Sequence, residues 1–547
     1  DEALQDLIYY DATLELFGVP VVYTPYLRHP DPTVERRTGF LTPQYGSSST
    51  LGYNLLVPYY FDLAPNRDFT FAPLVTEDEG VVLFGEYRER TETGTYVLDG
   101  SITYTDARDN TGQKTGGDEE RWHLKAEGLW HYDQTWQYGF DLYRSSDDTY
   151  LSRYSINDAD TLTSDLFAEG FRGRSYASAF GYAFQGLRPD EVQGEIPLVA
   201  PLLDYNMVTD PDEDGSFFTI DANTLALTRN DGTDSRRLSF EAGWERPFLT
   251  DGGHLFIYRA SLRGDAYQVD DVQLGNGLPD YSGFVGRVIP QTSLEWRYPL
   301  QRQSGSMQQL VEPIVMTVLS PNGGNPAEIP NEDSQDFEFD DVNLFSENRF
   351  PGLDRVEGGL RINYGLRMGV YGYGGGRSEF LIGQVWHAQD DDTFGPQSGL
   401  DGHFSDFVGR VLISPGRYVD LLYRFRLSND DLSFRRSELG FSVGPDWMKL
   451  SGNYIRLEDA PINVVDTSDA REQFNLRAST EILEEWTLQA DWRQDLSGGG
   501  TISYGGSLTY ENECIAITGR GERNFTDNIG IDPETVIFLT LKLKTLG

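Results

Sequence analysis

The residue types that most often carry out chemistry are scattered in this sequence. The six histidines are His29, His123, His131, His254, His387 and His403. His123 and His131 fall on the same face of a predicted strand, but about 26 Å of strand separates them. Because no histidine has the spacing of a zinc-ligand pair, we predict no metal site. The sequence also indicates no cofactor.

An acidic run is the other candidate for cation binding. It comprises Glu332, Asp333, Asp336, Glu338, Asp340 and Asp341. Carboxylate oxygens suit Ca²⁺, but the glycine that an EF-hand loop requires at its turn is absent. Two interpretations stay open, a calcium-binding loop and an acidic loop at the surface or inside a barrel, and we favour the second.

The elements that would position any site are strands. In residues 121–132 the side chains alternate between an aromatic, apolar face and a largely charged face. The first face carries Trp122, Leu124, Ala126, Gly128, Trp130 and Tyr132, and the second carries Arg121, His123, Lys125, Glu127 and His131. The same alternation recurs to a final strand near residues 536–546, although a polar tract at 106–120 predicts a long loop. A large transmembrane antiparallel β-barrel explains this better than a soluble β-array, which would show a repeat near 40–50 residues.

Composition agrees with a barrel. Only 38% of residues are hydrophobic, and no apolar stretch approaches the ~20 residues of a membrane helix. Barrel strands need apolar side chains only at alternate positions. The net charge of −43 excludes a nucleic-acid binder, which requires a clustered basic surface. Two explanations of the acidic charge stay open: Arg121 and Lys125 on the polar face of 121–132 make the interior less acidic than the loops, or divalent cations bridge the carboxylates to anionic groups.

The chain divides near residue 38. Residues 1–38 contain short apolar strands, prolines and a basic patch, and we expect the tail of a periplasmic β-domain and its linker, with Asp1 not the natural start. Residues 39–547 form the barrel. At ~20 residues per strand and connection they give on the order of 25 strands.

Several long motifs resemble the LptD family of lipopolysaccharide-assembly proteins, also called the organic-solvent-tolerance family. They are "VPVVYTPYLRHPDPTVERRTGFL" (Val19 to Leu41), "LVPYYFDLAPNRDFTFAP" (Leu56 to Pro73), "DDTYLSRY" (Asp147 to Tyr154), "LFAEGFRGRSY" (Leu166 to Tyr176) and the tract from Asn322 to Gly359. The resemblance implies a barrel of about 26 strands in the Gram-negative outer membrane, with a periplasmic N-terminus. It also implies that only the last strands of the family's N-terminal jellyroll are present.

The resemblance further implies a function. The barrel would insert lipopolysaccharide into the outer leaflet through its lumen and a lateral gate between its first and last strands. Pro43 and Pro58 match the family's gate prolines, and Val536, Phe538 and Thr540 lie on the facing last strand. Proline removes a ladder donor; the alternative is that Pro43 only starts a strand and Pro58 only ends one.

The implied partners are an LptE-type lipoprotein plug in the lumen, an LptA-type periplasmic bridge protein that binds the missing jellyroll, lipopolysaccharide, and outer-membrane lipid. Cys514 matches the second cysteine of a family pair, with Glu513 at the place of the first. It is therefore a candidate for a disulfide to the missing N-terminal domain, and a free thiol is the alternative.

Two other functions remain as alternatives. A porin or nutrient transporter is the first, although a porin should be smaller and a gated receptor needs an N-terminal plug domain. An outer-membrane lipid hydrolase is the second, but no Gly-x-Ser-x-Gly elbow occurs. We therefore predict that the chain is not an enzyme.

Overall fold

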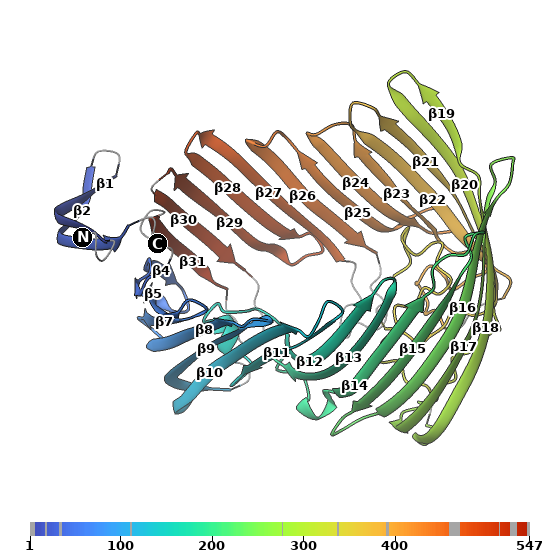
Figure 1. Ribbon diagram of the computed structural model, residues 1–547, viewed down its shortest axis with the longest axis horizontal. Helices are drawn as coiled ribbons and strands as arrows, with labels where there is room; N and C mark the ends of the chain where they lie inside the picture. The colour runs from blue at the N-terminus through green and yellow to red at the C-terminus, as the bar shows by residue number, and fades with distance from the viewer. Residues whose placement is uncertain are drawn as a thin grey trace.

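The structure is a computed structural model of the chain. It describes residues 6–16, 19–31, 36–109, 112–275, 277–335, 338–389, 393–458, 471–513, 515–525 and 533–543. Almost every described element is a strand, and the strands follow one another around a ring (Figure 1).

The early strands are β1 (Asp6–Leu16), β2 (Val19–Pro30), β3 (Gly39–Phe40), β4 (Gln44–Ser48), β5 (Gly52–Leu56), β6 (Tyr59–Ala64), β7 (Arg67–Thr76), β8 (Val81–Arg90), β9 (Gly94–Arg108), β10 (Lys114–His131) and β11 (Trp136–Ser145). After helix α1 (Tyr150–Arg153) come β12 (Thr161–Arg172) and β13 (Ser175–Gly186), then the 3₁₀ turn η1 (Gln193–Glu195). The middle strands are β14 (Leu198–Val208), β15 (Phe217–Thr228), β16 (Asp234–Leu249), β17 (Leu255–Val272), β18 (Tyr281–Arg297), β19 (Leu300–Ser304), β20 (Met307–Leu319), β21 (Leu360–Gly372) and β22 (Arg377–His387). The last are β23 (Phe407–Ser414), β24 (Val419–Leu427), β25 (Phe434–Val443), β26 (Met448–Leu457), β27 (Arg471–Leu483), β28 (Trp486–Asp495), β29 (Gly500–Glu511), β30 (Ile515–Asn524) and β31 (Thr535–Leu543).

Strands β3 to β31 form one closed antiparallel barrel. We call one full crossing of the barrel wall a stave, whether it is a single strand or two strands in line. Three staves are interrupted and consist of two strands each, namely β3 with β4, β5 with β6, and β18 with β19. Counted by stave, the barrel has 26 strands, which confirms the predicted fold class and size. Strands β1 and β2 pair only with each other in a separate two-stranded sheet, drawn outside the ring in Figure 1.

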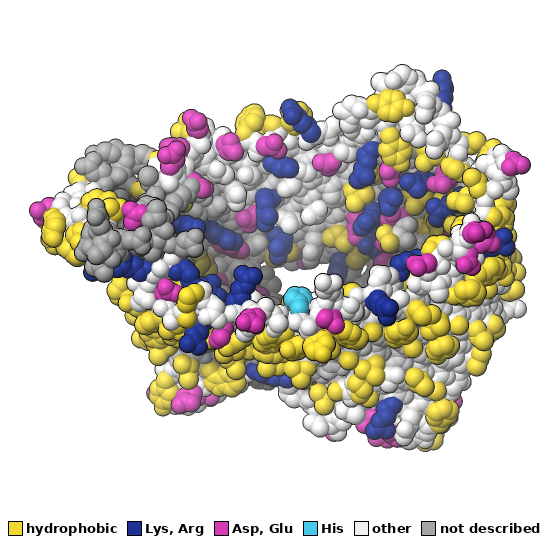
Figure 2. Space-filling view, in the orientation of Figure 1, with side chains coloured by type: hydrophobic (Ala, Val, Ile, Leu, Met, Phe, Trp, Pro, Cys, Tyr) yellow, Lys and Arg dark blue, Asp and Glu magenta, His cyan; other side chains and the backbone are white. Residues whose placement is uncertain are grey.

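The predicted alternation is present in the wall. On β10, Trp122 and Leu124 are exposed at 39% and 49%, whereas Arg121 and His123 are almost completely buried. Figure 2 shows hydrophobic side chains over the outer surface of the near wall and Lys and Arg side chains around the opening. The apolar face of this strand therefore points outward and the charged face points into the barrel.

The long loop expected at residues 106–120 is mostly strand. Strands β9 and β10 continue past the apolar segment, and Arg121 to Asp118 still pair with Thr103 to Asp106. The ladder becomes irregular between Asp118 and Lys114, where Gly116 and Gly117 have positive φ. Polar composition predicted a loop here, but backbone pairing with a neighbour is independent of side-chain polarity and extends the hairpin.

The buried apolar residues lie where connections fold against the inner wall. One cluster joins the turn at Leu51 to the connection between β11 and β12, and a second surrounds Phe339 and Leu344 between β20 and β21. No helix among the described residues has the length and hydropathy that crossing a bilayer requires. The core is thus local and divided, unlike the continuous core of a globular domain.

Candidate functional site

The ring closes through a short ladder between its first and last staves. Strand β31 pairs with β4 over five residue pairs, from Val536 with Ser48 to Thr540 with Gln44. On its other side β31 pairs with β30 over nine. Two further hydrogen bonds extend the junction, because Ser49 N–H donates to the Thr535 carbonyl at 3.1 Å and Thr535 N–H donates to Ser49 Oγ at 3.2 Å. We call this β4–β31 junction the seam.

The predicted gate prolines stand at interruptions of the first two staves. Pro43 directly precedes the first residue of β4, so the seam ladder ends beside it. Pro58 lies between β5 and β6, and its carbonyl accepts a hydrogen bond from Leu41 N–H at 2.9 Å. The two interruptions are therefore side by side, and each proline is both a strand boundary and a break in its stave.

The structure brings three predicted last-strand residues to the seam. Val536, Phe538 and Thr540 lie opposite Ser48, Gly46 and Gln44, respectively. A Cβ at Gly46 would stand 2.7 Å from the Phe538 ring. Glycine at this position lets the aromatic ring lie flat across the junction. Pro58 is one stave away from the seam and does not face β31.

A cavity of about 900 Å³ lies behind the seam. Its wall includes Val536 and Phe538 from β31 and Leu56 and Leu74 from the first staves, with Ile156 from the connection between β11 and β12. At the other end the lining is charged, with Arg36, Arg37, Asp68, Glu86 and Arg88. The interior near the seam is therefore amphipathic, with an apolar part and a charged part.

Arg36 attaches the linker to the first staves. Its guanidinium donates to Tyr60 Oη at 2.9 Å, to the Pro65 carbonyl at 2.7 Å and to Asp68 Oδ2 at 2.8 Å. Asp68 also accepts from Arg88 Nε at 2.8 Å. Arg36, from the basic patch seen in the sequence, thus attaches the linker to β6, to β7 and to the turn between them.

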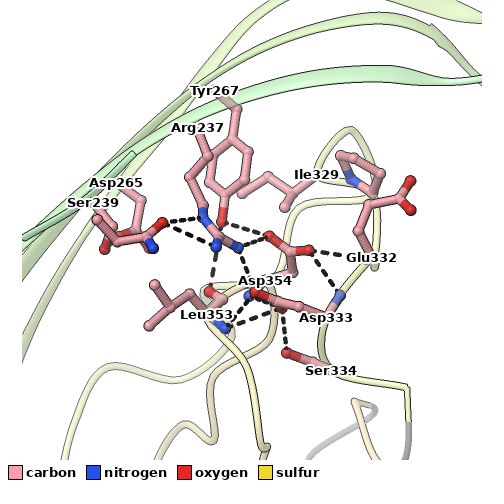
Figure 3. Close-up of polar contacts among 12 residues, drawn as sticks. Arg237, Ser239, Asp265, Tyr267, Ile329, Glu332, Asp333, Ser334, Leu353 and Asp354 are labelled. Carbon is pink, nitrogen blue, oxygen red and sulfur yellow. Dashed lines mark hydrogen bonds and ion pairs between the residues drawn. The ribbon is translucent and has the colours of Figure 1, made fainter. Parts of the chain in front are cut away.

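The opposite wall has a different interior. Eight arginines point inward from β16 to β25 and meet the connection between β20 and β21, residues 320–359. They are Arg237, Arg263, Arg287, Arg361, Arg410, Arg424, Arg426 and Arg436. Figure 3 shows Arg237 between Asp333 and Asp354, at 2.6 and 2.7 Å. We call residues 320–359 the luminal loop.

Glu357 is the most enclosed charge of the luminal loop. It is fully buried and contacts the Arg349 guanidinium, Arg361 Nε at 3.2 Å and His387 Nε2 at 3.4 Å. Burial raises the pKa of this carboxyl, but the two arginines outweigh burial and lower its pKa to about 2. Asp333 behaves alike, because Arg237 and backbone N–H groups overcome burial and lower its pKa to about 2. Both carboxylates are ionised at neutral pH.

The acidic run belongs to this loop. Glu332 pairs with Arg229, Asp333 with Arg237, Glu338 with Arg426 and Arg436, and Asp341 with Arg410 and Arg424. Asp336 lies outside the described residues. Of the two interpretations left open, the loop inside a barrel describes these residues, because arginines neutralise them.

Sequence reasoning missed the arginine wall. A signal was present in the pattern Arg424-x-Arg426, since residues two apart in a strand share a face. Arg410 and Arg436 lie on the neighbouring strands at paired positions. Basic residues recurring on one face of adjacent strands predict an inward charged wall, which needs an acidic partner.

The histidines do not form a metal site in the described part of the chain, where no group of three or more His, Cys, Asp or Glu side chains could hold an ion. His123 instead lies 2.6 Å from Ser101 Oγ and 3.0 Å from Asp99 Oδ1. Cys514 is outside the described residues, so its predicted disulfide stays a prediction.

Comparison with known proteins gives one family. The sequence profile of LptD, LPS transport system D, matches residues 119–486. Among similar curated proteins, LPS-assembly protein LptD of Pseudomonas savastanoi pv. phaseolicola is 25% identical and that of Alkalilimnicola ehrlichii is 27% identical. Each alignment covers 98% of this chain, but 65% and 70% of those proteins. The chain spans about two thirds of the length of the relatives it matches.

Solved structures give only weak similarity. The ferric-catecholate import receptor Fiu of E. coli covers 94% of the chain at 8% identity, with a TM-score of 0.28. The siderophore receptor PirA of Pseudomonas aeruginosa covers 93% at 9% identity, with a TM-score of 0.32. Similarity at this level carries no argument about function.

Proposed function

This chain belongs to the LptD family, and from that premise we propose that it inserts lipopolysaccharide into the outer leaflet through a lateral opening at the seam. Family and fold make it an outer-membrane barrel protein. The relatives' names describe assembly, which agrees with the prediction that the chain is not an enzyme.

The shortness of the seam carries the proposal. Its five ladder positions compare with nine between β30 and β31, and it ends at Pro43, which has no N–H to donate. At ~1 kcal/mol net per hydrogen bond, separating it costs about 5 kcal/mol, and more where lipid replaces water. The ladder between β11 and β12 has six positions, so the seam is distinguished by its short ladder together with its end at Pro43.

The two parts of the substrate need different paths. A phosphorylated sugar head requires a polar route, whereas acyl chains must reach hydrocarbon without crossing water. A closed barrel offers only the first. In our proposal the sugars pass along the lumen while the acyl chains leave between β4 and β31, past the apolar side chains Val536 and Phe538.

The strongly acidic composition does not oppose an anionic substrate. Inward arginines, including Arg237 and Arg361, pair with carboxylates of the luminal loop and so neutralise part of the acidic charge inside the barrel. The luminal loop neutralises many of them, so the free path lies on the seam side. This loop connects neighbouring strands and is not an N-terminal plug domain, so it gives no support to the nutrient-receptor alternative.

The proposed partners follow from the family. An LptE-type lipoprotein would occupy the lumen, and an LptA-type bridge would deliver lipopolysaccharide from the periplasm. We place the N-terminal sheet, with residues 1–38, on the periplasmic side as the remnant of a jellyroll. Cys514 would form its disulfide with the preceding part of that domain.

A cysteine lock across the seam is the decisive experiment. Gln44→Cys with Thr540→Cys joins residues that pair in β4 and β31. Both this pair and the control pair are placed in a Cys514→Ser background, whose own delivery is measured first because Cys514 is a candidate for a disulfide. We expect oxidation to stop surface delivery of lipopolysaccharide and reduction to restore it. The control, Ser442→Cys with Ser451→Cys, joins paired residues of β25 and β26. Normal delivery by the oxidised seam pair would refute the proposal.

The prolines provide a second test. Pro43→Ala with Pro58→Ala returns two backbone donors to the first staves and should strengthen pairing near the seam. We expect slower appearance of newly made lipopolysaccharide at the surface. Unchanged delivery would remove these prolines from the gate.

A further inference from the structure

The turn between β4 and β5, which contains Leu51, is hydrogen-bonded to the turn between β7 and β8. Asp78 N–H donates to the Leu51 carbonyl at 3.2 Å, and Glu77 N–H donates to the Tyr53 carbonyl at 3.0 Å. Glu79, in the same turn, accepts from Arg108 at 2.6 Å and from Arg153 at 3.1 Å. The hairpin β4–β5 is thereby connected to residues far along the chain.

Arg153 belongs to the connection between β11 and β12, residues 146–160, which is itself firmly attached to the wall. Arg121 is fully buried and holds Asp147 at 2.6 and 2.9 Å. Tyr150 is also fully buried, and its hydroxyl shares a hydrogen bond of 2.6 Å with Ser101. Two strands of the wall, β9 and β10, therefore fix this connection in place.

Leu51 inserts into the apolar side of this connection. It is 6% exposed and belongs to one buried cluster with Tyr150 and Leu151. The remaining buried members of the cluster are Leu74, Val82, Tyr143, Tyr154, Leu162 and Leu187. Ile156 packs against the cluster and also lines the cavity behind the seam with Val536 and Phe538.

We propose that the connection 146–160 positions the seam: Tyr150 and Leu151 hold Leu51, and Leu51 holds the hairpin β4–β5 against β31. The hairpin is interrupted at Pro43 and Pro58 at its other end, so besides the ladders it is attached by the buried Leu51 and by the hydrogen bonds of Glu77 and Asp78. When the hairpin β4–β5 moves away from β31, Leu51 must leave the cluster. This inference rests on the proposed function in assigning opening to the seam.

The two ends of the hairpin β4–β5 therefore have different roles in opening. The proline end has few ladder bonds to break, whereas the Leu51 end must expose a buried side chain. Opening thus begins at the proline end and is limited at the Leu51 end. Tyr150 and Leu151 make no backbone hydrogen bond of the seam, so in this proposal they act on it through the packing of Leu51.

Amide hydrogen exchange measures this directly. In the full chain in micelles, Leu51→Ala and Leu151→Ala should each accelerate exchange in residues 44–48 and 536–540 by about tenfold or more, as expected for loss of a buried leucine. The ladder between β25 and β26 should be unchanged. Leu51→Met, which conserves volume, should restore slow exchange, and Leu51→Val, the milder variant, should be intermediate.

Leu227→Ala is the matched control. Leu227 is 5% exposed in a separate cluster with Val199 and Leu225, so its loss should leave seam exchange unchanged. Seam exchange that stays slow in both Leu51→Ala and Leu151→Ala, or that rises equally in Leu227→Ala, would overturn the inference. Accelerated exchange together with normal delivery by the oxidised Gln44–Thr540 lock would leave the positioning role standing and refute the proposed function.

Discussion

The two sides of this barrel are held together in different ways. On the seam side, β4 and β31 share five ladder positions and the interior is a cavity. On the opposite side, strands β16 to β25 surround a folded loop, and arginines bind its carboxylates. The two strands of the seam are joined by a short ladder, and the opposite side is held by charge over a large area.

This difference supports our proposal that the barrel opens at the seam and not at the opposite wall. A buried charge left without its partner is expensive, so an ion-paired loop has one favoured position. A short ladder or an apolar contact costs less to separate than a buried ion pair, and can form again. The luminal loop therefore keeps one wall constant, and the seam is the part of the barrel that we propose opens. The following predictions would break or sharpen this contrast.

The largest effect is expected at Glu357. Glu357→Ala leaves Arg349 and Arg361 buried without their carboxylate, which should cost about 3–5 kcal/mol of unfolding free energy. Guanidinium unfolding in micelles would measure the loss. Glu328→Ala is the control, since this half-buried loop carboxylate makes no ion pair in the described part of the chain. An equally small effect of both would show that charge does not hold this wall.

The second-largest effect is expected from acid, which should destabilise the same wall. The pKa values of Asp333 and Glu357 are lowered to about 2, below the ordinary ~4. Their contribution is therefore complete above about pH 4.5 and is lost as the pH falls toward 2, at about 1.4 kcal/mol for each unit of lowering. Unfolding midpoints at pH 7, 4 and 2.5 would show it.

The variant Asp333→Asn with Glu357→Gln tests that assignment. It should be less stable than the parent at pH 7 and should lose less between pH 4 and 2.5. If the parent and the variant lost the same stability between pH 4 and 2.5, the acid-sensitive groups would lie elsewhere in the protein.

A smaller effect is expected at the seam. Gly46→Ala places a Cβ 2.7 Å from the Phe538 ring and 2.8 Å from Asn54 Oδ1. The ring must move, at a cost of about 1–3 kcal/mol, and amide exchange at residues 536–540 should accelerate. Phe538→Ala should relieve the effect. The matched control is Gly519→Ala on β30, where a Cβ would meet nothing within 4 Å.

The sequence predicted the wall well and its interior poorly. The alternation at Trp122 and Arg121 identified the outer and inner faces, because that pattern depends only on neighbouring residues in one strand. The contact of Arg237 with Asp333 joins residues 96 apart, and no local pattern encodes such a pair. Long-range pairing inside the barrel therefore had to come from the structure.

The seam was only partly predictable. Pro43 and Pro58 are visible as ladder breakers, and their assignment to a lateral gate, which the resemblance to LptD implies, stays a prediction. The burial of Leu51 was not visible, because a leucine in a polar turn gives no sign that another connection covers it. Tertiary contact decides its role, and composition does not.

The same junction bears on how the ring is first made. Ser49 and Thr535 are 486 positions apart, so they meet only after nearly all the chain has been laid into neighbouring hairpins. Contacts of such separation form late, whereas hairpins zip locally. The barrel consequently grows as an open sheet whose two free edges join last. A closing edge of five residues leaves little to align at that final step.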